Sequence, residues 1–158
     1  MELLRANQTH IPGLIRLLRQ VGQVHHRGRP DLFRFGAQKY DEARLEQILL
    51  DESRPVFVAQ QDGKVLGYGF CVLKQTRDNT VLCDHTSLYI DDLCVDEDHR
   101  GQRIGSRLYA HITDYARQLG CDSITLNVWA FNESAMAFYR SLGMQERNIY
   151  MEKKLGEQ

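Results

Sequence analysis

The sequence has no long apolar run and no strong charge of either sign. None of its segments approaches the roughly 20 consecutive apolar residues that a membrane-spanning helix needs. The N-terminus, Met-Glu-Leu-Leu-Arg, also lacks the basic and then apolar pattern of a signal peptide. The formal net charge is −1, so no overall positive field favours nucleic acid as a partner. These absences predict a cytoplasmic protein that binds neither membranes nor nucleic acid.

Paired-cysteine motifs are also missing. The four cysteines are scattered along the chain and none forms a CxxC pair: Cys71, Cys83, Cys94 and Cys121. A zinc ribbon or a redox motif is therefore not indicated. His85 lies near Cys83 and His25 adjoins His26, but the two pairs share no local pattern. We predict buried free thiols and no metal site.

What the sequence does have is a regular change of apolar period over 158 residues, a length typical of one domain. We therefore expect a single domain covering residues 1–158. In chain order the pattern predicts a strand at 2–5, a helix capped by Thr9 and continuing to Val21, a helix at 41–50, a hairpin of 56–60 and 65–73, a strand within 80–95, a long helix ending at Leu119, a strand at 123–129, a helix at 132–143 and a last strand at 144–153.

The most informative stretch runs from Leu88 to Leu119 and passes from a strand through a charged turn into a helix. Gly101 and Gly105 flank the expected helix start, and Arg100 and Arg103 lie beside them. The first N–H groups of a helix have no intrahelical acceptor and carry the positive end of its dipole, so they can bind a phosphate. The alternative is that both glycines serve the backbone alone.

Two familiar phosphate-binding loops do not fit these residues. A P-loop requires Gly-Lys followed by Ser or Thr, and no such run occurs. A dinucleotide fingerprint requires GxGxxG, whereas residues 101–106 read Gly-Gln-Arg-Ile-Gly-Ser.

The stretch resembles instead the acyl-CoA loop of the GNAT family of N-acetyltransferases. Arg100 and Gly105 match the ends of that loop, whereas Arg103 stands where the family usually has glycine. This departure leaves the backbone angle at Arg103 open, since a non-glycine residue fits wherever φ is negative. A second stretch resembles the family's NxxAxxFYxxxGF segment, through Asn132, Ala135, Phe138, Tyr139, Leu142, Gly143 and Met144. Two motifs in the expected order are more specific than either alone.

The resemblance implies an α/β fold, with a twisted mixed sheet of about six or seven strands flanked by about four helices and containing a splayed parallel strand pair. It also implies acetyl-CoA as co-substrate, with no metal, and leaves a homodimer possible. The diphosphate would bind the backbone of the loop, formed by Arg100, Gly101, Gln102, Arg103, Ile104, Gly105 and Ser106. Pantetheine would lie along Leu93, Cys94 and Val95, and Asn132 and Tyr139 would also contact the cofactor.

Three residues are candidates for catalysis. By the resemblance, Tyr139 would protonate the departing thiolate, although it could equally be a packed core tyrosine. Asp91 and Asp92 lie where a base is needed to deprotonate the acceptor amine, Asp91 acting through water, or they merely mark a strand end. Because side chains alternate along a strand, only one of the two should face a given side.

The segment 24–40 mixes cations, aromatics, Gly and Pro without a clean period, as an acceptor-binding loop or a plain connection would. Its weak candidates for the acceptor site are His25, His26, Arg29, Phe33 and Phe35. Acidic residues Asp84, Asp91 and Asp92 favour a cationic acceptor, whereas this basic segment favours an anionic one.

The sequence is thus interpreted as an enzyme that transfers acetyl from acetyl-CoA to a primary amine of a small molecule, polyamine-like or aminoglycoside-like. The alternatives are a peptide or ribosomal-protein N-terminal acetyltransferase and a non-catalytic acyl-CoA sensor.

Overall fold

The structure is a computed structural model that describes residues 1–156. The chain forms two compact units, one from Met1 to Asn127 and one that begins at Val128. The first unit contains β1 (Glu2–Arg5), η1 (Gln8–His10), α1 (Ile11–Gly28), α2 (Glu42–Leu50), β2 (Val56–Gln61), β3 (Lys64–Thr76), β4 (His85–Val95), η2 (Glu97–His99), α3 (Ile104–Gln118) and β5 (Ser123–Leu126), and the second contains α4 (Glu133–Ser141).

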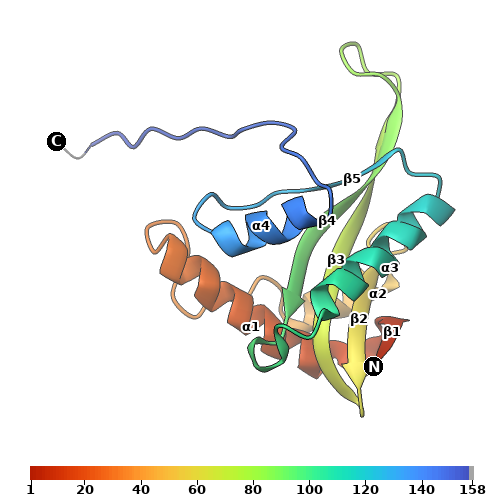
Figure 1. The fold of residues 1–158 in the computed structure, drawn as a ribbon, viewed down its shortest axis with the longest axis vertical. Coiled ribbons are helices and arrows are strands. Elements are labelled where there is room, and N and C mark those ends of the chain that lie inside the picture. The colour runs from red at the N-terminus through yellow and green to blue at the C-terminus, as the bar shows by residue number, and fades with distance from the viewer. Residues whose placement is uncertain (157–158) are drawn as a thin grey trace. The chain divides into compact units, whose positions relative to one another are not determined.

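The five strands form one sheet in the order β1-β2-β3-β4-β5 (Figure 1). The first four strands pair antiparallel, and β5 pairs parallel to β4. The mixed α/β class is therefore confirmed, with five strands in the described residues rather than six or seven. The shortfall lies partly in the predicted strand at 144–153, which has no strand partner in the described chain. Alternating apolar residues specify a strand only where a neighbouring strand completes its hydrogen bonds.

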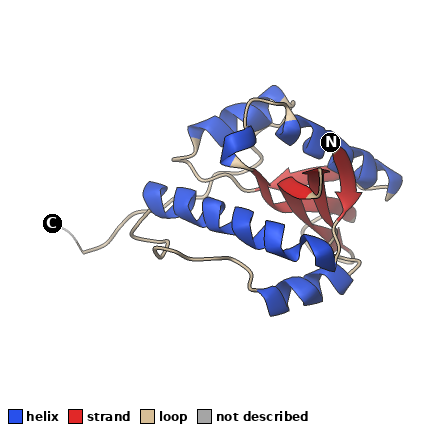
Figure 2. Cartoon of the chain, turned by 90° about the horizontal axis from the view of Figure 1, so that it is seen from below, coloured by secondary structure: helices blue, strands red, loops and turns tan. Residues whose placement is uncertain are grey.

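Helices cover both faces of this sheet (Figure 2). Helix α1 buries Leu14, Leu17 and Leu18 on one face, with Leu45 and Ile48 of α2 beside them. Helix α3 buries Ile104, Leu108, Ile112 and Ala116 on the other face. Leu119 continues the same apolar spacing but is exposed just past the end of the helix. The apolar spacing of three and four residues had indicated both helices, since such residues share one helical face.

The close packing of α3 on β3 depends on two glycines. A Cβ atom at Gly69 would lie 2.5 Å from Ile112 Cδ1, and one at Gly67 would lie 2.8 Å from the Cys94 carbonyl oxygen. A side chain at Gly69 would therefore displace the Ile112 side chain of α3, and one at Gly67 would clash with the main chain of β4 and crowd Leu108 of α3 at 3.0 Å. The sequence Gly-Tyr-Gly therefore sets the distance between α3 and the strands.

The N-terminal region corrects two predictions. Thr9 is not the helix cap; Asn7 caps the short turn η1 by accepting a hydrogen bond from the Thr9 amide at 2.9 Å, and α1 follows directly. Helix α1 also continues to Gly28, well past Val21. His25 and His26 consequently lie on its last turn rather than in a loop, because polar residues can extend a helix whose first turns are already packed.

The remaining strand boundaries and cysteines also differ in part from the predictions. Strand β4 begins at His85 and β5 ends at Leu126, so both are shorter than the apolar runs that contain them. Cys71 and Cys94 are buried free thiols, as predicted, but Cys83 is exposed on the loop between β3 and β4. No helix in the described residues is long and apolar enough to cross a membrane.

In the second unit, α4 begins and ends with the residues that the sequence indicated. The Asn132 side chain caps the helix by accepting a hydrogen bond from the Ala135 amide at 3.2 Å. At the other end Gly143 has φ +89°, a conformation that favours glycine, and the Met144 amide donates to the Tyr139 carbonyl at 3.1 Å.

Candidate functional site

Strand β4 has an edge that the sheet leaves partly unused. Its parallel pairing with β5 ends at Ile90 and Leu126, whereas pairing with β3 continues to Val95. Over residues 91–95 no described strand covers the other edge of β4. An extended ligand could add there as a further strand, although the Asp91 carbonyl already accepts a hydrogen bond from Lys39 at 3.2 Å.

The predicted pantetheine contacts, Leu93, Cys94 and Val95, lie on this open edge. Their side chains are turned away from it: the Cys94 thiol points at the Leu17 carbonyl at 4.0 Å, and Leu93 and Val95 pack in the core under α3. Burial raises the pKa of the Cys94 thiol to about 12, so it is not a nucleophile. These three residues could therefore contact a ligand only through their main-chain N–H and C=O groups.

The chain then turns through η2 into the loop that precedes α3. Gly101 has φ +78° and Arg103 has φ +60°, and α3 starts at Ile104 with no side-chain cap. The φ of Arg103 is therefore positive, and not the negative angle at which a non-glycine residue is unstrained. Arginine occupies the left-handed conformation for which glycine is usual, at a cost of about 1 kcal/mol.

This loop has the features of an anion site. The first amides of α3, at Ile104, Gly105 and Ser106, lack intrahelical acceptors and remain uncapped by any side chain of the described residues. Arg100, Gln102 and Arg103 are exposed around them. The end of an open strand edge thus leads directly to a positively polarised helix start.

Asp91 and Asp92 lie at a bulge in β4. Phe70 pairs with Asp92 and Cys71 with Ile90, so Asp91 has no partner in the register. The extra residue cancels the alternation of side chains, which is the reason that the prediction of one aspartate per face is wrong. Both carboxylates contact tyrosines that belong to the core under α1 and α2.

The two aspartates have different partners. Asp91 accepts a hydrogen bond from the Tyr40 hydroxyl at 2.5 Å and forms an ion pair with Lys39 at 3.0 Å. Asp92 accepts a hydrogen bond from the Tyr68 hydroxyl at 2.9 Å and has no ion pair. The Tyr40 hydroxyl in turn accepts a hydrogen bond from the Arg54 guanidinium at 3.1 Å.

These partners move the pKa values of the two carboxyls in opposite directions. Burial acts to raise the pKa of Asp91, but the hydrogen bonds from Tyr40 and Lys39 outweigh it, so the pKa is lowered. Burial raises the pKa of Asp92 to about 6, with the charge of Asp91 acting in the same sense. Asp92 is therefore the carboxyl able to exchange a proton near neutral pH.

Sequence reasoning missed the residues that set this difference. Lys39 and Tyr40 precede α2 and Arg54 follows it, and none belongs to a motif. Burial also raises the pKa of Tyr40, to about 12, so its hydroxyl remains a hydrogen-bond donor. The only signal was the mixture of cations and aromatics in residues 24–40.

The weak acceptor candidates cluster at the end of α1. His25 packs on Phe33 with 4.8 Å between ring centroids, His26 contacts the ring of Phe35 edge-on at 5.4 Å, and Arg29 forms an ion pair with Asp31 at 2.8 Å. Burial, and next the charge of Lys39, lower the pKa of His25. Lys39 thus links this cluster electrostatically to Asp91.

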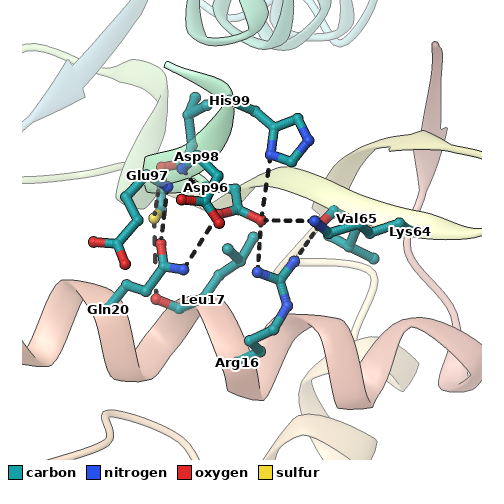
Figure 3. Close-up of polar contacts among 11 residues, drawn as sticks. Arg16, Leu17, Gln20, Lys64, Val65, Asp96, Glu97, Asp98 and His99 are labelled. Atoms are coloured by element: carbon teal, nitrogen blue, oxygen red, sulfur yellow. Dashed lines mark hydrogen bonds and ion pairs between the residues drawn. The ribbon is translucent and has the colours of Figure 1, made fainter.

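A second charged cluster lies at the end of β4, just before the loop (Figure 3). The Asp96 side chain is fully buried and forms ion pairs with Arg16 at 2.6 Å and Lys64 at 3.7 Å, and its Oδ2 lies 3.6 Å from the His99 ring nitrogen Nδ1. Burial acts to raise the pKa of Asp96, but the hydrogen bonds from Arg16 and Gln20 outweigh it and lower the pKa to about 2. This carboxylate is permanently charged.

Tyr139 and Asn132 belong to the second unit. The Tyr139 ring packs edge-on against Phe138, 5.1 Å between centroids, on a half-buried face of α4. Asn132, which the resemblance implies as a cofactor contact, caps α4 in the structure. In the described residues no group of three His, Cys, Asp or Glu side chains could hold a metal ion.

An open strand edge that leads to an uncapped, glycine-flanked helix start defines a class of protein that binds an extended, phosphate-bearing ligand. Residues 23–144 match the model of the acetyltransferase (GNAT) family. The chain therefore belongs to this family, as the sequence motifs had suggested.

Two comparisons extend the match over different lengths. The thialysine N-epsilon-acetyltransferase of Bos taurus is 35% identical over 112 residues, which cover 71% of this chain and 60% of the bovine enzyme. The chain thus spans less than two thirds of that relative. The crystal structure of a mutant of the BH1408 protein from Bacillus halodurans has a TM-score of 0.94 at 33% identity, covering 98% of this chain and 99% of that one.

A third comparison concerns the fold alone. The aminoglycoside N-acetyltransferase AAC(6')-Iy, solved in complex with CoA, has a TM-score of 0.70 at 17% identity and covers 98% of this chain and 100% of that one.

Proposed function

We propose that the protein is an acetyl-CoA-dependent N-acetyltransferase that acetylates a primary amine of a small molecule, polyamine-like or aminoglycoside-like. The observation that carries the proposal is the open edge of β4 at residues 91–95, which runs into the uncapped start of α3. Family membership supports the same ligand. The chain's match to a bovine enzyme named for acetylating an amine supports the reaction type.

Acetyl-CoA would use the backbone along its whole length. The diphosphate accepts hydrogen bonds from the amides at residues 104–106, with Arg100 and Arg103 adding positive charge. The pantetheine arm follows the edge from Val95 back towards Asp91, a span of about 13 Å at the usual strand rise. The thioester then lies beside the bulge, where a strand N–H can polarise its carbonyl.

The transfer needs one proton acceptor and one proton donor. The acceptor amine, as its free base, attacks the thioester carbonyl, the N–C bond forms and the C–S bond breaks. Asp92 takes the proton from the amine, directly or through water. The departing thiolate takes a proton from the Tyr139 hydroxyl, so that CoA leaves as a thiol.

Asp92 is a better base than Asp91 for a physical reason. A base that works near neutral pH needs a pKa close to the working pH, and burial raises the pKa of Asp92 to about 6. Asp91 is already satisfied by Tyr40 and Lys39, which lower its pKa. We assign Asp91 to attracting and orienting the acceptor cation and Asp92 to proton transfer.

In the sequence, acidic residues favoured a cationic acceptor and the basic segment 24–40 favoured an anionic one. The ion pairs of the structure reduce this conflict. Arg29 is paired with Asp31 and Lys39 with Asp91, so part of the basic charge in residues 24–40 is neutralised internally. Asp92 forms no ion pair within the described residues, although the charge of Lys39 acts to lower its pKa. A cationic amine is consequently favoured over an anionic acceptor at this end of β4.

The test is thiol release from acetyl-CoA with a panel of polyamines, aminoglycosides, thialysine and peptides with a free N-terminus. Release with a small amine supports the proposal. Release with peptides alone would shift the assignment to a peptide acetyltransferase, and CoA binding without release would indicate a sensor.

The acid role of Tyr139 has its own test. Tyr139→Phe removes only the hydroxyl, so kcat should fall about 100-fold while the KM for acetyl-CoA stays close to that of the wild type. Tyr150→Phe is the matched control, since Tyr150 is 98% exposed. An unchanged rate for Tyr139→Phe would remove this residue from the mechanism.

A further inference from the structure

The turn between β4 and the loop is attached to helix α1 as well as to the sheet. The last sheet-type hydrogen bond of this segment runs from the Asp96 amide to the Leu66 carbonyl at 2.8 Å. Beyond it the chain leaves β3, and the contacts that hold it come from side chains. Figure 3 shows Arg16 and Gln20 of α1 reaching the turn.

Gln20 makes two hydrogen bonds with opposite roles. Its amide nitrogen donates to Asp96 Oδ1 at 3.3 Å, and its amide oxygen accepts from the Glu97 backbone N–H at 3.1 Å. One side chain of α1 therefore holds both the buried carboxylate and the main chain of the turn. Because Gln20 holds the main chain at Glu97, it helps to set the direction in which the chain continues into the loop.

Arg16 fixes the same carboxylate to the sheet. One of its nitrogens donates to Asp96 Oδ2 at 2.6 Å, and the other donates to the Val65 carbonyl at 2.6 Å. Asp96 also accepts a hydrogen bond from the Asp98 amide of its own turn, at 3.3 Å. The carboxylate is thus the point at which α1, β3 and η2 are joined.

The loop after this joint has little else to hold it. The side chains of Arg100, Gln102 and Arg103 make no hydrogen bond to any other described residue. Its backbone also carries two positive φ angles, one of them at an arginine. The orientation of the loop is therefore set at its two ends, by the Asp96 cluster and by α3.

We propose that Gln20 and Arg16, acting through Asp96, are positioning residues that hold the loop at residues 100–103 in the conformation that binds the coenzyme A diphosphate. Helix α1 thereby controls cofactor affinity although it contributes no ligand to the cofactor. The inference rests on the proposed function, because it assigns the diphosphate to this loop.

The test compares Gln20→Ala and Asp96→Asn with Ile48→Val, a conservative core change in α2 that touches neither the turn nor the loop. Calorimetry with coenzyme A should show a Kd raised about five-fold for Gln20→Ala, from the loss of two modest hydrogen bonds, and raised further for Asp96→Asn. Ile48→Val should bind like the wild type at a temperature where all the variants are folded.

An acetyl donor that lacks the diphosphate tests whether the effect of Gln20→Ala acts at the diphosphate site. Acetylpantetheine carries the thioester and the arm without the diphosphate. Gln20→Ala should therefore lower kcat/KM for acetyl-CoA and leave kcat/KM for acetylpantetheine unchanged, with kcat at saturating acetyl-CoA also unchanged.

Three results would overturn the inference. The first is a folded Gln20→Ala variant that binds coenzyme A like the wild type. The second is an equal loss with both donors, which would mean a general structural effect. A wild-type protein without affinity for coenzyme A would instead refute the proposed function itself, and this inference with it.

Discussion

Two aspartates at the end of β4 have pKa values shifted in opposite directions: Asp92 on the strand and Asp96 directly after it. At the bulge, Asp92 has one tyrosine hydroxyl as its partner, and burial raises its pKa to about 6. Four residues further on, burial also acts to raise the pKa of Asp96, but hydrogen bonds from Arg16 and Gln20 lower it to about 2. The partners of the two residues differ: Asp96 forms ion pairs with Arg16 and Lys64 and accepts from Gln20, whereas Asp92 accepts a hydrogen bond from Tyr68.

The difference in partners decides which of the two carboxyls can transfer a proton. A carboxyl that is buried without an ion pair has a raised pKa, so it can exchange a proton near neutral pH. Burying it in its charged form lowers the stability of the folded protein. A carboxyl that is buried among cations is locked as an anion and stabilises the chain around it. Of these two aspartates, Asp92 is therefore suited to proton transfer, whereas Asp96 stabilises the fold.

The largest effect should come from removing the base. Asp92→Asn keeps the size of the side chain and its contact with the Tyr68 hydroxyl, so kcat should fall 10²- to 10⁴-fold, about 3 to 5 kcal/mol in activation free energy. Steady-state kinetics with the best amine of the panel would measure this.

The pH profile is the control for that experiment. The wild type should lose kcat/KM below about pH 6 as Asp92 takes up a proton. The residual rate of Asp92→Asn should lack this limb, and Asp114→Asn, a change at an exposed ion pair of α3, should keep it. A limb that persists in Asp92→Asn would assign the base elsewhere.

The next largest effect is on stability at the other cluster. Asp96→Asn leaves Arg16 and Lys64 facing a neutral group, which should lower the free energy of unfolding by about 3 kcal/mol at pH 7. The folded pKa of Asp96 lies below its ordinary value, so this contribution is present above about pH 4 and is lost as the pH falls through about 2. Urea denaturation at pH 7 and pH 2.5 should show the difference between wild type and variant shrinking.

The opposite sign is expected for the same substitution at the bulge. The folded pKa of Asp92 lies above its ordinary value, so folding favours the protonated form and stability is lost as the pH rises from about 4 through about 6. Asp92→Asn should therefore raise the free energy of unfolding by about 3 kcal/mol at pH 8 and change it little at pH 4. A destabilised variant at pH 8 would show that the contact with Tyr68, not the charge, dominates.

The smallest effect concerns the loop that the Asp96 cluster holds. Arg103→Gly relieves the left-handed backbone at this position and should raise the free energy of unfolding by about 1 kcal/mol. It also removes a cation from the proposed diphosphate site, so affinity for coenzyme A should fall. Thermal denaturation with and without coenzyme A separates the two effects, and Arg117→Gly, on a negative-φ helical position, should destabilise.

The sequence by itself determined the α/β class, the two packed helix faces and the loop before α3. These features depend on contacts between near neighbours: apolar residues three and four positions apart, glycines at turns and two short motifs. Residues such as Ile104, Leu108 and Ile112 define one face of a helix wherever that helix is placed. Local patterns carry this information because the helix period is fixed by the backbone.

Only the tertiary structure decided which aspartate is which. Alternation predicted Asp91 and Asp92 on opposite faces, and a bulge, which depends on the register with β3, put both on one. Lys39 and Tyr40 lie more than 50 positions from Asp91, and Arg16 lies 80 positions from Asp96. A pKa depends on burial and on neighbouring charge, and both are fixed by residues that only folding brings together.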